Sequence, residues 1–264
     1  MIKLIVSDVD GTLIFDETKI NVLNPRALEL IAECKKRGIT FAVASGRSYA
    51  NLKKVFLPQW ENLYFLSDNG NIMYYNNKLL RELPIPQPLV REIIDYLIDH
   101  PTMGVSFTTA EKMLLFEEPK WFSDLCIYDM KNAVILIDDI QEIYAEKIIN
   151  ISTFVPEDQA EEQDRDFNER WGDLLQITRS GSGWVEFALS GKGAGVRVIM
   201  ERHGYTKDEV MVFGDNYNDI EMLSSVTHSF AMAGADDEVK AHAKYVTPSV
   251  EDVIERFLNT GEIG

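Results

Sequence analysis

The chain has 264 residues, of which 45% are apolar and 26% are charged, and this composition excludes a disordered or fibrous protein. Its net charge of −17 disfavours nucleic acid and anionic lipid as partners, because a surface this negative repels both. The two cysteines, Cys34 and Cys126, have no metal-type spacing and fit a reducing compartment. With no signal-peptide pattern and no apolar stretch of membrane-spanning length, the sequence predicts a cytoplasmic protein of one large or two modest domains.

Three short apolar runs in the first third of the chain predict buried strands, each followed by polar residues. They cover residues 2–7, 39–44 and 63–66. Between the first two runs, Asn24 and Pro25 are typical of the start of a helix, and Gly38 is typical of its end. Strand, helix and strand at this spacing indicate a βαβ unit and therefore a parallel sheet.

The same pattern returns late in the chain, where strands and helices alternate again. Strands are predicted at residues 184–189, 210–213, 230–232 and 245–247, and helices at 196–203, 219–223 and 250–258. The two halves therefore predict a single α/β domain built on one parallel sheet.

The middle of the chain differs, and it begins with a proline cluster at residues 83–88 that is typical of a crossing between domains. Helices are then predicted at residues 90–98 and 140–150, β-like runs at 105–107, 113–116 and 133–137, and a solvated acidic helix face at 157–166. A second α/β unit over residues 84–186 is therefore predicted inside the first domain, which takes residues 1–83 and 187–264.

Four polar clusters follow predicted strand ends or begin predicted helices. Their polar side chains are those of Asp8, Asp10, Ser45, Lys192, Asp215 and Asp219. Ligands of open parallel sheets bind outside the carboxyl ends of the strands, so these side chains are expected to converge. Several carboxylates around one point need a cation, and an all-oxygen set favours Mg²⁺. Because Ser45 at a helix start and Lys192 suit a phosphate, we interpret the site as a phosphoryl cradle.

Each cluster taken alone has a simpler interpretation. The Asp8–Thr12 loop could be a calcium-like loop or a plain turn, and Ser45 with its neighbours could be a turn and an N-cap. Residues 214–219 could form an Asx turn, and Lys192 could be a surface lysine. The shared position of all four clusters at strand ends makes chance a poor explanation.

These four clusters, in this order, resemble the motifs of the haloacid dehalogenase-like phosphatases. They read Asp-Val-Asp-Gly-Thr-Leu at 8–13, Ser-Gly-Arg at 45–47, Lys-Gly at 192–193 and Gly-Asp-Asn-Tyr-Asn-Asp at 214–219. Ser-Asp-Asn-Gly at 67–70 and the large insert between the second and third motifs are similar to the Cof-type branch. The resemblance implies a doubly wound, Rossmann-like core with an inserted α/β cap domain that selects the substrate.

The resemblance also implies roles for the acids. Asp8 would be the nucleophile that attacks phosphorus, and Asp10 would be the general acid and base. Mg²⁺ would contact Asp8, the backbone carbonyl of Asp10 and Asp215. Asn218 and Asp219 would hold metal-bound water or orient the lysine of the third motif.

Other residues of the motifs are implied to bind substrate. Ser45, Gly46 and Lys192 would hold the phosphoryl oxygens, Arg47 would reach toward the substrate or the cap, and Asn69 would line the cleft. The chain departs from the family pattern at Gly234, where similar proteins usually have Asn, and this puts a loop contact near the site in doubt.

The predicted activity is hydrolysis of a phosphomonoester of a small soluble molecule, such as a sugar phosphate or a phosphorylated cofactor. Two alternatives stay open on the sequence alone. A phosphotransferase or mutase would pass the phosphoryl group of the same aspartyl phosphate to a sugar hydroxyl. A non-catalytic ligand sensor on the same fold is disfavoured by the presence of both Asp8 and Asp10.

Overall fold

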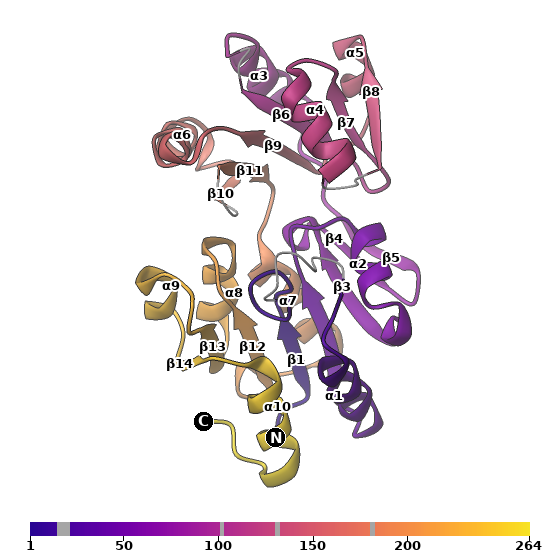
Figure 1. Ribbon diagram of the computed structural model, residues 1–264, viewed down its shortest axis with the longest axis vertical. Helices are drawn as coiled ribbons and strands as arrows, with labels where there is room; N and C mark the ends of the chain where they lie inside the picture. The colour runs from indigo at the N-terminus through magenta and orange to yellow at the C-terminus, as the bar shows by residue number, and fades with distance from the viewer. Residues whose placement is uncertain (15–21, 101–102, 130–132, 180–182) are drawn as a thin grey trace. The chain divides into compact units, whose positions relative to one another are not determined.

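The computed structural model describes residues 1–14, 22–100, 103–129, 133–179 and 183–264 (Figure 1). The chain divides into two compact units, each described here by itself. The core unit combines Met1–Arg81 with Gly191–Gly264, and the inserted unit is Glu82–Ser190. Within the described ranges, no helix has both the length and the apolar character needed to cross a membrane.

The core unit is built on an eight-stranded sheet with the order β14-β13-β12-β1-β2-β3-β4-β5. Its strands are β1 (Leu4–Ser7), β2 (Thr40–Ala44), β3 (Leu63–Ser67), β4 (Ile72–Tyr75), β5 (Lys78–Glu82), β12 (Val210–Gly214), β13 (His228–Met232) and β14 (Tyr245–Thr247). Pairing is parallel from β14 through β3, and β4 is antiparallel to β3. The chain runs outward from β1 in both directions, which places the turn of strand order between β1 and β12, where ligands bind in such sheets.

Helices cover both faces of this sheet. They are α1 (Pro25–Lys36), α2 (Tyr49–Val55), α7 (Lys192–His203), α8 (Ile220–Ser225), α9 (Asp237–Ala241) and α10 (Val250–Thr260). Side chains alternate along each strand, so Ile5 packs with α1, α2 and α10, whereas Leu4 and Val6 pack with α7, α8 and α9. Two buried layers therefore hold the sheet rigid beneath its carboxyl edge.

The inserted unit has a six-stranded sheet with the order β10-β11-β9-β6-β7-β8. Its elements are α3 (Gln87–Ile98), β6 (Gly104–Thr108), β7 (Met113–Phe116), α4 (Lys120–Asp124), a π-helical turn (Leu125–Asp129), β8 (Val134–Ile137), α5 (Ile140–Tyr144), β9 (Asn150–Phe154), α6 (Glu157–Trp171), β10 (Gln176–Arg179) and β11 (Trp184–Ala188). Pairing is antiparallel except between β7 and β8. Helices α3 and α6 pack on one face through Val90, Ile94 and Phe167.

The predicted helix over residues 140–150 is wrong in its second half. Helix α5 ends at Tyr144, and the buried apolar run that follows it leads into β9. Strand β9 pairs with both β6 and β11, so ladder hydrogen bonds on two sides determine its conformation. A short apolar run fits a buried helix or a central strand equally well, and tertiary pairing decides between them.

Candidate active site

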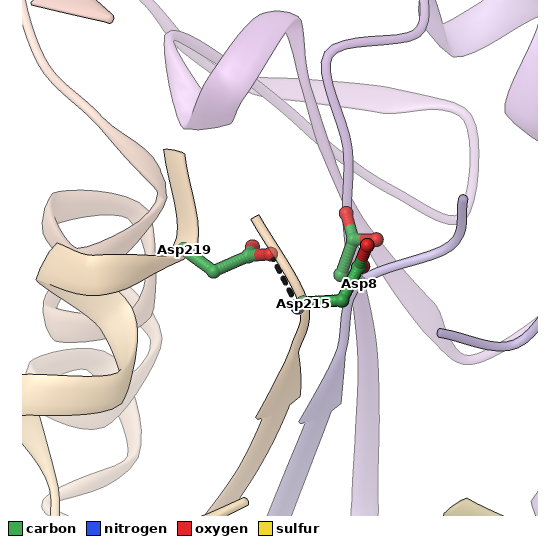
Figure 2. A group of neighbouring side chains, drawn as sticks. All are labelled: Asp8, Asp215 and Asp219. Atoms are coloured by element: carbon green, nitrogen blue, oxygen red, sulfur yellow. Dashed lines mark hydrogen bonds between the residues drawn. The ribbon is translucent and has the colours of Figure 1, made fainter. Parts of the chain in front are cut away.

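Asp8 and Asp215 lie just beyond the ends of adjacent strands. Strands β1 and β12 pair in parallel with Ser7 opposite Phe213, and the backbone N–H of Asp8 donates to the Phe213 carbonyl at 2.9 Å. Figure 2 shows the two carboxylates side by side at this edge, with Asp219 approaching from the other side. Parallel pairing therefore brings together two acids from opposite ends of the chain.

A buried lysine joins two of the acids. Lys192 is the first residue of α7, after the N-cap Gly191, and its exposed fraction is 1%. Its Nζ donates to Asp8 Oδ1 at 2.5 Å and to Asp219 Oδ1 at 2.7 Å. Burial alone would lower the pKa of Lys192, but the Asp219 and Asp8 carboxylates outweigh it and raise that pKa. The ammonium group therefore stays charged between the two carboxylates.

Asp219 is fully occupied by donors from the chain. Its Oδ1 accepts from Lys192, and its Oδ2 accepts from the backbone N–H groups of Asp215 at 2.9 Å and Asn216 at 3.0 Å. The side chain is completely buried in the 3₁₀ turn Tyr217–Asp219 that leads into α8. Of the two roles implied for Asp219, this geometry supports the orientation of Lys192.

One ammonium group does not balance the three acids at this edge. One oxygen atom from each of Asp8, Asp215 and Asp219 lies within 4.8 Å of the other two. Burial and the neighbouring acids raise the pKa of Asp8 well above its usual range, and burial followed by Asp219 raises that of Asp215 to about 6. Lys192 neutralises only part of the negative charge of the three carboxylates, and the remaining charge on their oxygens fits a hard divalent cation such as Mg²⁺. Asp8 and Asp215 are the side chains that could bind it, because Asp219 already has its donors.

The loop after β1 positions Asp215. Thr12 Oγ1 donates to Asp215 Oδ1 at 2.6 Å. Gly11 has a φ of +77°, and a Cβ atom built on it would lie 2.2 Å from Asp215 Oδ2. A glycine is therefore required there both for the backbone conformation and for the close approach of the carboxylate.

Asp10 and Arg47 form an ion pair apart from the acidic cluster. Arg47 Nε donates to Asp10 Oδ2 at 2.8 Å, and Arg47 Nη2 donates to Asp10 Oδ1. The Asp10 side chain is 48% exposed, whereas that of Arg47 is 16% exposed. The guanidinium group, which we expected to reach toward the substrate or the cap, contacts the carboxylate of the expected acid and base.

Ser45 and Gly46 follow β2 at the same edge of the sheet. Ser45 is 2% exposed, its Oγ accepts from the Arg47 backbone N–H at 3.2 Å, and its own N–H donates to the Leu66 carbonyl. The prediction that Ser45 begins a helix is wrong, because α2 starts at Tyr49. Ser45 and Gly46 instead belong to a loop held against the neighbouring strand.

Asn69 contacts another predicted site residue. Asn218 Nδ2 donates to Asn69 Oδ1 at 3.0 Å, and the two side chains are 8% and 5% exposed. Asn69 was expected to line the cleft, and the structure places it against Asn218 inside the core unit. The structure thus brings Asp8, Lys192, Asp215 and Asp219 into one cluster, with two separate pairs, Asp10–Arg47 and Asn69–Asn218.

A family model described as haloacid dehalogenase-like hydrolase matches residues 5–258. The chain belongs to this family. Two hydrolases from Escherichia coli K12 are similar to it along nearly their whole lengths. The 5-amino-6-(5-phospho-D-ribitylamino)uracil phosphatase YbjI is 28% identical over 268 residues, covering 97% of this chain and 96% of that protein. The pyridoxal phosphate phosphatase YbhA is 25% identical over 278 residues, covering 97% of each.

The fold is also similar to that of a solved structure. The crystal structure of SMU.1108c from Streptococcus mutans UA159 has a TM-score of 0.89 and 25% identity, covering 98% of this chain and 100% of that one. The predicted membership of the Cof-type branch of the haloacid dehalogenase-like phosphatases is confirmed, as is the α/β fold class with its insertion. The chain is an enzyme of the phosphatase class.

The sequence did not reveal two contacts of the candidate site, and it left the reason for Gly234 open. Neither Thr12 as a partner of Asp215 nor the Asp10–Arg47 pair was predicted, although Thr12 lies within the first motif. Gly234, where similar proteins usually have Asn, is exposed, and a Cβ atom there would meet nothing within 4 Å. The space around this position would therefore accept a side chain, so packing does not explain the glycine.

Proposed function

We propose that this enzyme hydrolyses a phosphomonoester of a small soluble metabolite, with Mg²⁺ bound and through an aspartyl phosphate on Asp8. The observation that carries the proposal is the buried contact of Lys192 with Asp8, beside Asp215, which forms no ion pair among the residues that the structure describes. Lysine holds the nucleophile in place and adds positive charge where phosphoryl oxygens would lie. Such an arrangement suits phosphoryl transfer, in which positioning and charge supply most of the catalysis.

Asp8 is the proposed nucleophile. One carboxylate oxygen attacks phosphorus, the ester P–O bond breaks, and the leaving alkoxide takes a proton from Asp10. Asp10 then takes a proton from a water molecule that attacks the same phosphorus, which releases inorganic phosphate and restores the Asp8 carboxylate. Mg²⁺ held by Asp8, Asp215 and the Asp10 carbonyl would supply the positive charge that lets an anionic nucleophile approach an anionic phosphate. Ser45 and Gly46 would bind the phosphoryl oxygens from the adjacent loop.

The Asp10–Arg47 pair supports a defined resting position for the acid and base. A bidentate guanidinium–carboxylate contact fixes both the position and the plane of the carboxylate. The Asp10 side chain is nearly half exposed in this position, so a leaving group or a water molecule can reach its carboxylate from solvent. We infer that Asp10 changes partners when a leaving group is bound.

The proposed substrate is a small phosphorylated metabolite, as the names of the relatives indicate. YbjI acts on a phosphorylated ribitylaminouracil and YbhA on pyridoxal phosphate, so a sugar-like phosphate and a phosphorylated cofactor are the first candidates. We infer that the inserted unit, Glu82–Ser190, acts as the cap that selects the leaving group. The net charge of −17 also favours a small substrate over nucleic acid.

The test is phosphate release from a panel of phosphomonoesters that includes these two compounds, with Mg²⁺ and with EDTA. We expect release that EDTA abolishes and that Asp8→Asn reduces to background. Full activity of the Asp8→Asn variant would rule out the aspartyl phosphate. Release that appears only with a bisphosphate activator, together with an isomerised product, would assign the enzyme as a mutase.

A further inference from the structure

A buried amide in the core unit has one polar atom without a hydrogen-bond partner among the described residues. Asn218 Nδ2 donates to Asn69 Oδ1 at 3.0 Å, and both side chains are more than nine-tenths buried. Asn218 Oδ1 is also buried, yet among the residues that the structure describes it has no hydrogen-bond partner. A buried acceptor without a donor is unfavourable, because it has lost its hydrogen bonds to water without replacing them. The carbonyl oxygen of Asn218 is therefore a buried acceptor that a bound ligand or water molecule could satisfy.

The backbone that carries Asn69 is strained. Asp68, Asn69 and Gly70 have φ values of +48°, +54° and +84°, three left-handed residues in succession. Non-glycine residues are strained in this region, and such strain concentrates at functional sites. Asparagine is one of the few side chains that tolerate it. The conformation that directs the Asn69 side chain toward Asn218 therefore lowers the stability of the fold.

This strained turn also touches the loops that hold other predicted site residues. The backbone N–H groups of Asp68 and Asn69 donate to the carbonyls of Arg47 at 3.2 Å and Ser45 at 3.0 Å. A Cβ atom on Gly70 would lie 3.1 Å from the Gly191 carbonyl, so the turn also packs against the start of α7. One turn thus fixes Asn69 relative to the loops that carry Ser45 and Lys192.

We propose that Asn69 is a positioning residue that selects the orientation of the Asn218 amide for metal binding, an inference that rests on the proposed Mg²⁺ site. A carboxamide has a donating end and an accepting end, and the Asn69 carbonyl oxygen holds the donating end of Asn218. The accepting end then points away from Asn69, and in this proposal its oxygen takes a hydrogen bond from water bound to the cation. Outer-shell hydrogen bonds of this kind commonly change metal affinity tenfold or more.

Two substitutions of Asn69 distinguish the effect of its hydrogen-bond acceptor from the effect of its left-handed backbone conformation. Asn69→Gly removes the acceptor and tolerates a φ of +54°, so it introduces no backbone strain. Asn69→Asp keeps an acceptor for Asn218 and also tolerates the left-handed conformation. With Mn²⁺ as the probe, binding is measured by the loss of its free EPR signal, and Mg²⁺ is measured by calorimetry. We expect Asn69→Gly to weaken binding about tenfold and Asn69→Asp to bind no more weakly than the wild type.

A third substitution tests orientation itself. In Asn218→Asp both ends of the side chain are oxygen atoms, so there is no orientation left to select. Asn69→Gly should therefore change the Mn²⁺ affinity less than twofold in the Asn218→Asp background, against about tenfold in the wild type. A merely structural role for Asn69 would weaken binding equally in both backgrounds.

The possible results distinguish this inference from the proposed function. If the wild type binds neither ion, the Mg²⁺ site is refuted and the inference is refuted with it. If the wild type binds and Asn69→Gly binds equally well, only the inference is refuted. Equal losses in both backgrounds, or a loss in Asn69→Asp as large as in Asn69→Gly, would refute it as well.

Discussion

Replacing Asp215 by Asn is expected to stabilise the metal-free core unit while it abolishes Mg²⁺ binding. Burial and the Asp219 charge raise the pKa of Asp215 to about 6, so its ionised form opposes folding. Asparagine keeps an oxygen that can accept from Thr12, and it removes the charge. The same substitution deletes one of the two side chains proposed to bind the cation.

The magnitude and its pH dependence follow from that pKa. Moving a carboxyl pKa from about 3.9 to about 6 disfavours the ionised native form by roughly 3 kcal/mol. Between these two pH values the native state holds the proton more tightly than the unfolded state, so Asp215 reduces stability as pH rises. The gain from Asp215→Asn should therefore be near zero at pH 4, grow up to about pH 6 and stay near 3 kcal/mol above it.

Amide hydrogen exchange is the appropriate assay, because the chain has two compact units and a single unfolding midpoint would mix them. Protection of the buried amides of β1 and β12 reports the opening free energy of the core unit. The experiment is run in EDTA at several pH values and repeated with Mg²⁺. Added Mg²⁺ should stabilise the wild type at neutral pH and leave Asp215→Asn unchanged.

Two matched substitutions control for the loss of a negative charge. Asp237 is fully exposed, so Asp237→Asn should leave protection unchanged at every pH. Asp219 is buried against Lys192 and two backbone N–H groups, so Asp219→Asn should destabilise the core by about 3–5 kcal/mol. The reasoning is refuted if Asp215→Asn is no more stable than the wild type at neutral pH in EDTA. It is also refuted if the gain does not change with pH.

Three further substitutions test separate parts of the site. Lys192→Met leaves two buried carboxylates without their cation, so the core should lose about 3–5 kcal/mol near neutral pH and less at pH 5, measured by the same exchange experiment. Gly11→Ala should weaken Mg²⁺ binding more than about tenfold in calorimetry, because its Cβ atom would displace the Asp215 carboxylate. Gly38→Ala, at a similar positive φ with open space around it, should leave that affinity unchanged, and equal affinities in both variants would contradict the steric argument. Asp10→Asn should lower kcat by about 10²–10⁴-fold with unchanged Mg²⁺ affinity, because the Asp10 side chain lies outside the acidic cluster.

Much of the core fold could be predicted because its signals are local. Apolar runs of strand length ending in polar residues, and the Asn24-Pro25 helix start, each depend on a few neighbouring residues. Asn24 does accept from the Arg26 backbone N–H, as an N-cap should. The inserted unit was harder, because the conformation of β9 is decided by its pairing with β6 and β11 rather than by its own sequence.

The site divides in the same way. Parallel strands place the residues after β1 and β12 at the same edge of the sheet, so the convergence of Asp8 and Asp215 could be predicted, and the pairing of β1 with β12 brings them together. The contact of Arg47 with Asp10 could not be predicted, because a long side chain in a loop can reach several groups. The conformation of the loop decides which group it contacts. The left-handed turn at Asn69 was equally out of reach, since it arises from contacts with the loops around it.

The charge balance of the site predicts that Mg²⁺ binds before the phosphorylated substrate. Three carboxylates and one buried ammonium give the edge of the sheet an excess of negative charge, in a chain whose net charge is already −17. A phosphate ester entering that site would add further negative charge at close range, which is strongly unfavourable in a poorly solvated environment. The described residues at this edge therefore hold the nucleophile in place but supply too little positive charge to bind a phosphate tightly by themselves. We expect phosphate analogues such as vanadate to bind measurably only when Mg²⁺ is present, and tight vanadate binding in EDTA would contradict this reading of the site.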